Sequence, residues 1–98
     1  MDYETFKSSL KSENTPENLS SGLLALWLDA KGKWELAHEM AQQVPDPEGA
    51  WVHAYLHRVE GDLSNATYWY ERAKKEVCNL GLQEEWESIV RDLLKDYR

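Results

Sequence analysis

Apolar residues recur along this chain with the period of an α-helix, and the pattern divides it into five or six helical segments. The clearest signal lies in residues 51–73, WVHAYLHRVEGDLSNATYWYERA, which are typical of two helices joined by a tight turn at Gly61 and Asp62. Glycine suits the left-handed residue that ends many helices, and aspartate suits the N-cap of the next one. No stretch alternates convincingly with a period of two, so we predict no strands and an all-α fold.

Start and stop signals predict where each helix begins and ends. Residues 2–12 have a weak amphipathic pattern, and Thr15 and Pro16 are typical of the N-cap and first residue of a helix that runs to about Lys31. Asp46 is expected to cap a helix that begins at Pro47. The other predicted helices cover residues 34–44, 62–77 and 83–97. In the helix over residues 62–77, the buried stripe is expected to run from Leu63 to Val77.

The clearest helix pair has a weaker copy 29 residues upstream, LLALWLDAKGKWELAHEMAQQV. Gly32 corresponds to Gly61, and Ala37 corresponds to Ala66. This pattern resembles the tetratricopeptide repeat (TPR), a helix–turn–helix unit that stacks into a superhelix. The resemblance covers about residues 18–74, with repeats at about 18–46 and 47–75, a closing helix at 82–97 and a further helix at the N-terminus. It implies a single domain over residues 1–98, an α-α superhelix whose concave face, lined by the first helix of each repeat, binds a peptide or protein.

Composition narrows the classes of partner. The chain has 98 residues and a formal net charge of −7, which argues against binding to nucleic acid or an anionic membrane, because phosphates need a basic surface. The single cysteine, Cys78, excludes an internal disulfide framework and a multi-cysteine metal site, and we expect it to be buried and inert. The longest apolar run is too short for a bilayer, so we expect a cytoplasmic protein.

A ridge of large side chains on one predicted helix is the candidate binding site. Trp51, Tyr55 and Arg58 lie at positions i, i+4 and i+7, and the preceding repeat presents Leu26 and Asp29 at the matching face. Aromatic residues and arginine are enriched where interfaces bury most of their energy. We expect these five residues to bind an apolar side chain and a basic group of a partner. The alternative is that Trp51 and Tyr55 pack in the core.

Two histidines are the candidate metal ligands. His53 and His57 lie four residues apart on one helix, but Ala54 stands where the zinc-protease motif has glutamate, and a third ligand would have to come from His38 or an acidic residue. We therefore expect a structural role for both histidines, with no metal and no cofactor. Since no catalytic motif is present, the sequence predicts a non-enzymatic interaction module. Two alternatives are a structural homodimer subunit and a helical metal-binding protein that uses His53 and His57.

Overall fold

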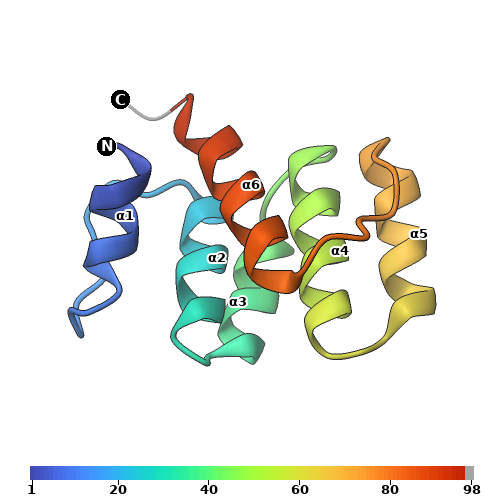
Figure 1. The fold of residues 1–98 in the computed structure, drawn as a ribbon, viewed down its shortest axis with the longest axis horizontal. Helices are drawn as coiled ribbons and strands as arrows, with labels where there is room; N and C mark the ends of the chain where they lie inside the picture. The colour runs from blue at the N-terminus through green and yellow to red at the C-terminus, as the bar shows by residue number, and fades with distance from the viewer. Residues whose placement is uncertain (97–98) are drawn as a thin grey trace.

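The computed structural model of the protein describes residues 1–96 and folds them into helices only (Figure 1). No strand occurs among these residues, so the all-α prediction is confirmed. The predicted end of the last helix at Tyr97 lies outside the described residues. The helices are α1 (Tyr3–Ser9), α2 (Ser21–Ala30), α3 (Trp34–Ala41), α4 (Glu48–Val59), α5 (Leu63–Ala73) and α6 (Leu82–Leu94).

Two helical hairpins, α2/α3 and α4/α5, form the centre of the molecule, and α4 packs against both helices of the first hairpin. Both turns use the predicted glycine: Gly32 has a φ of 80° and Gly61 a φ of 86°. After each glycine, the next amide donates a 2.9 Å hydrogen bond back into the preceding helix, from Lys33 to Leu28 and from Asp62 to His57. The matching backbone bonds explain the repeated sequence pattern, because each turn needs a residue with positive φ at the same place.

Three predicted helix ends are wrong, and one of them is the end of α3, which lies at Ala41 rather than at Val44. α2 begins at Ser21 rather than Pro16, because the Ser20 hydroxyl accepts a 3.2 Å bond from the Leu23 amide and caps the helix. α5 ends at Ala73, since Lys74 adopts the left-handed conformation with a φ of 60°.

The corrected ends change which side chains are buried. Because α5 stops early, Val77 is 49% exposed and does not continue the buried stripe. Leu63, at the start of that stripe, is 64% exposed. Asp46 does not cap α4, because its carboxylate accepts hydrogen bonds from Arg72 on α5 instead.

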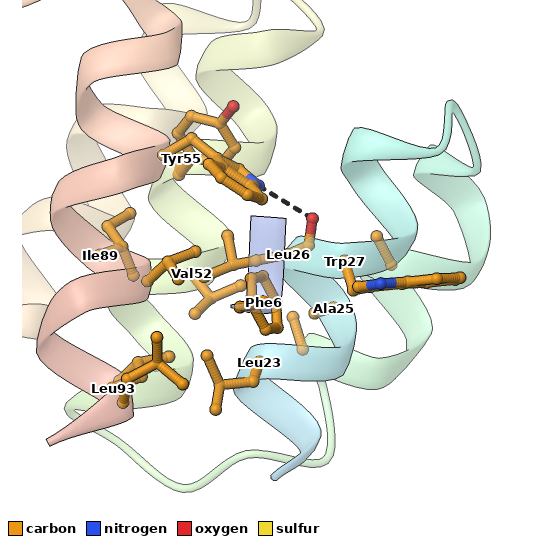
Figure 2. Packing of buried hydrophobic residues seen from close by; sticks show 14 of the residues in the cluster. Phe6, Leu23, Ala25, Leu26, Trp27, Val52, Tyr55, Ile89 and Leu93 are labelled. Carbon is orange, nitrogen blue, oxygen red and sulfur yellow. Dashed lines mark hydrogen bonds between the residues drawn. The ribbon is translucent and has the colours of Figure 1, made fainter. Parts of the chain in front are cut away.

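After α5 the chain turns back, and the amphipathic helix α6 lies across α2 and α4 (Figure 1). The main hydrophobic core fills the space between these three helices, and Figure 2 shows Leu23, Leu26, Val52, Ile89 and Leu93 meeting there. All five side chains are buried. The C-terminal helix therefore covers the face that the family resemblance assigns to a ligand.

The short helix α1 packs on α6 and completes the core. The rings of Tyr3 and Phe6 lie 6.2 Å and 5.9 Å from the ring of Trp86 on α6. The Trp86 indole N–H donates a buried 2.9 Å hydrogen bond to the carbonyl of Leu26 on α2. Trp86 thus ties α1, α2 and α6 together and holds α6 in place over the hairpins.

Candidate functional site

The predicted binding face, formed by the first helices of the two hairpins, is covered by α6. Leu26 has no exposed surface, and Tyr55 is only 4% exposed. The expectation that these two residues line an open groove is therefore wrong. The alternative interpretation, that the aromatic ridge packs in the core, holds for Tyr55.

Asp29 is half-buried and lines a smaller cleft of about 290 Å³, together with Lys7, Gln83 and Trp86. Burial raises the pKa of Asp29, although the neighbouring Tyr55 hydroxyl opposes that rise. Burial, and then the neighbouring Asp29 charge, raise the pKa of Tyr55. The two side chains belong to α2 and α4 and lie at the contact between the two hairpins.

Arg58 is engaged by α6 and by the segment that precedes it. Its Nη1 donates a 2.8 Å hydrogen bond to Oε1 of Glu85, and its Nη2 donates to the carbonyl of Leu80. Glu85 is 3% exposed, and its other oxygen accepts a 2.5 Å bond from the Tyr70 hydroxyl on α5. Burial and the Glu85 hydrogen bond raise the pKa of Tyr70, which therefore stays protonated and donates. Arg58 is thus a structural partner of α6, and no sequence signal indicated that Glu85 would be buried.

Trp51, the first residue of the predicted ridge, lies at an open cleft. It is half-buried at the edge of a cleft of about 470 Å³ between the start of α4 and the end of α6. The apolar wall of this cleft consists of Trp51, Val44, Pro45, Pro47 and Leu93. Lys75 also lines the cleft, and its ammonium lies 4.1 Å from the centre of the Trp51 ring, within cation–π range.

Carboxylates surround this Trp51 cleft. Asp46, Glu48 and Asp92 all line it, and Asp46 is paired with Arg72, whereas Lys75 is the one lysine or arginine in the lining. Burial raises the pKa of Glu48, and the nearby charges of Asp96 and Asp92 raise it further. A cation placed in the cleft would relieve this repulsion, so the site favours a basic group beside an apolar one.

The histidines form a second cluster, at the junction of α3, α4 and α5. The ring of His38 lies 4.8 Å from that of His53 and 5.3 Å from that of His57, measured between ring centres. His53 and His57 are both buried, and His38 is half-buried. Sequence analysis left the third ligand open between His38 and an acidic residue, and the structure places His38 beside both histidines. The sequence signal that could have identified His38 is Trp34, which lies four residues earlier and therefore on the same side of the helix.

Cys78 is half-buried rather than buried, so the predicted state of this thiol is wrong. It lies in the extended segment between α5 and α6, beside Trp51 and Lys75. The sequence predicted a helix up to residue 77. Because α5 ends at Ala73 instead, Cys78 does not continue a buried helix face. Within residues 1–96, no helix is both long and apolar enough to cross a bilayer.

Comparisons of this chain with family models, with curated proteins and with solved structures found no match.

Proposed function

We propose that this chain is a small tetratricopeptide-like interaction module without catalytic activity, which binds a protein or peptide segment in the Trp51 cleft. The observation that carries the proposal is a half-buried tryptophan in a cleft with apolar walls, where the carboxylates of Asp46, Glu48 and Asp92 outnumber the one lining lysine. An aromatic anchor surrounded by polar groups is the usual composition of an energetically important interface centre. The proposed setting is the cytoplasm, where a free thiol such as Cys78 stays reduced.

The cleft is a better candidate than the face between α2 and α4. That face already holds α6, and a helix of the same chain competes at a high effective concentration with any external segment. The Trp51 cleft is open while α6 stays in place. It lies at the edge of the same face, next to Leu93 of α6.

The chemistry of the cleft defines the partner as a segment with an apolar side chain flanked by lysine or arginine. Its apolar wall has the size for one large side chain, and Glu48 and Asp92 favour an adjacent cation. The net charge of −7 attracts basic segments over a longer range at low salt.

The test uses fluorescein-labelled hexapeptides with a central leucine or phenylalanine flanked by lysines or by glutamates. We expect fluorescence polarisation to detect binding of the lysine peptides only, with affinity falling as salt rises. Trp51→Ala should weaken binding about 30-fold, which corresponds to about 2 kcal/mol, while Leu82→Ala, a change at an exposed leucine outside the cleft, should not.

Three results would overturn the proposal: equal binding of glutamate peptides, unchanged binding by Trp51→Ala, or no binding at all. Circular dichroism must show that Trp51→Ala is folded. If this variant is unfolded at ordinary temperature, Trp51 is a core residue and the cleft assignment fails.

A second copy of the chain is the rival occupant of the cleft. Sedimentation of the wild type and of Trp51→Ala identifies that outcome as a dimer that the substitution dissociates.

A further inference from the structure

The Trp51 cleft already contains a cation from its own chain. Lys75 lines the cleft, and its ammonium lies over the Trp51 ring at 4.1 Å from the ring centre. A tryptophan ring attracts an ammonium that lies over its face, because the face of the ring carries partial negative charge. None of the ion pairs among residues 1–96 includes Lys75. The Trp51 ring is therefore the group that holds the Lys75 charge in the cleft.

The backbone of Lys75 is fixed, whereas its side chain is exposed. Lys74 ends α5 in the left-handed conformation with a φ of 60°, and the Lys75 amide donates a 3.0 Å hydrogen bond to the carbonyl of Tyr70. A lysine side chain loses much rotamer freedom when it is held in one position, and it regains that freedom in water. Lys75 can therefore leave the Trp51 ring by rotation of its side chain alone, while α5 and the turn stay unchanged.

One carboxylate of the cleft has no cation at ion-pair distance. Asp46 and Asp92 each form an ion pair with a basic residue outside the cleft lining. Glu48 is half-buried and belongs to none of the ion pairs that the described residues form. Because burial raises the pKa of Glu48, a neighbouring cation would stabilise its charged form. A partner's basic group beside Glu48 therefore gains an attraction that Lys75 does not receive at ion-pair distance.

We propose that Lys75 is an intramolecular competitor for the partner's basic residue: a lysine or arginine of the bound segment takes the place of the Lys75 ammonium over Trp51, beside Glu48. The inference rests on the proposed peptide site. Two cations over the same ring repel each other at short distance, so the partner's charge enters as Lys75 turns out into water. While Lys75 occupies the ring, the apparent affinity is reduced to the fraction of molecules in which the ring is free. An exposed cation–π contact corresponds to roughly a two- to fivefold preference for the occupied state.

Two lysine variants provide the matched comparison. Lys75→Gln removes the competitor, and Lys74→Gln removes the same charge from the neighbouring exposed residue, which does not line the cleft. In fluorescence polarisation at about 0.15 M salt, where the Debye length is about 8 Å, we expect Lys75→Gln to bind the lysine hexapeptides about threefold more tightly than the wild type. Lys74→Gln should change the affinity by less than about 1.5-fold. Equal gains in the two variants would show an effect of net charge only and overturn the proposal.

Nuclear magnetic resonance follows the exchange directly in the wild-type chain. Protons held over an aromatic ring resonate upfield, so the ε-methylene signal of Lys75 should lie apart from those of the other lysines and disappear in Lys75→Gln. Binding of a lysine hexapeptide should return this signal to the usual lysine position. The ε-methylene of a peptide lysine should then show a nuclear Overhauser contact with the Trp51 ring.

The outcomes separate this inference from the peptide site itself. If the peptide binds while the Lys75 signal stays upfield, Lys75 is not displaced, so the inference fails and the peptide site stands. A Lys75 signal at the usual position in the free chain would also overturn the inference, because the ring would then be unoccupied. If the lysine peptide binds neither the wild type nor Lys75→Gln, the peptide site fails and the inference fails with it.

Discussion

Removing the Glu85 carboxylate from α6 should destabilise the fold strongly. Glu85 is buried and receives one hydrogen bond from Arg58 and one from the Tyr70 hydroxyl. In Glu85→Ala, the Arg58 side chain, which is 17% exposed, keeps its charge and loses its partner carboxylate. Breaking a buried pair in this way costs roughly 3–5 kcal/mol, and we expect about 3 kcal/mol because Arg58 keeps partial access to water and its bond to the Leu80 carbonyl.

The measurement is the free energy of unfolding from urea titrations, followed by far-ultraviolet circular dichroism. A loss of about 3 kcal/mol corresponds to a fall of roughly 12–24 °C in the melting temperature of a domain this size. Glu85→Gln keeps the volume and one acceptor, and it should cost about 1–2 kcal/mol. Gln83→Ala, at an exposed position on the first turn of the same helix, is the control and should change stability by less than about 0.5 kcal/mol.

A double-mutant cycle with Tyr70→Phe identifies the network itself. If Glu85 and Tyr70 are coupled as the 2.5 Å contact indicates, the double mutant should lose less stability than the sum of the two single-mutant losses, by about 1 kcal/mol or more. A Glu85→Ala loss below about 1 kcal/mol, or additive losses, would refute the reasoning. α6 would then be held by its apolar face alone.

Three further predictions concern other parts of the core. Because the folded pKa of His53 is about 4 against 6.5 in the unfolded chain, the unfolded state binds more protons between these values. Stability should therefore fall by up to about 3 kcal/mol as pH drops from 6.5 to 4, and urea titrations of wild type and His53→Gln should differ in this slope. Ala66→Leu should overpack the contact with Ala54 and cost about 1–3 kcal/mol by thermal melting, and an unchanged melting temperature would remove Ala66 from that contact. Gly49→Ala should cost about 3 kcal/mol in the same assay, since the new Cβ would lie too close to the backbone carbonyl of Val44, and a stable variant would contradict this.

The helices were predictable because their signals are local. Gly32 and Gly61 each provide the positive φ that the turn requires, and no distant residue is needed to identify them. The start of α2 was missed because two good local signals compete: Thr15 with Pro16, and Ser20. Ser20 is the actual cap, bonded to the amide of Leu23, a side chain that is buried in the core. The choice between equal caps depends on tertiary packing, which the sequence pattern does not contain.

The position of α6 could not be predicted for a related reason. Its apolar pattern indicates a buried face but does not identify the helices that it meets. The non-helical segment 74–81 is long enough to return the chain to α2 and α4, and this return buries Tyr55 and engages Arg58. The predicted site residues were thus correctly placed on one face, and the occupant of most of that face is the chain itself.

The first-helix face keeps two clefts, the Trp51 cleft at the start of α4 and a smaller one beside Asp29, which Lys7 also lines. α6 covers the middle of the face at Leu26 and Tyr55, and the histidine cluster lies on the other side of α4, toward α3 and α5. Trp51 lies on the same helix as both, but its ring packs beside the Lys75 ammonium and the cleft. A substitution at Trp51 should therefore weaken peptide binding while leaving the core folded. His38→Gln, in the histidine cluster, should leave peptide binding unchanged, and a loss of binding in that variant would show that α4 couples the two regions.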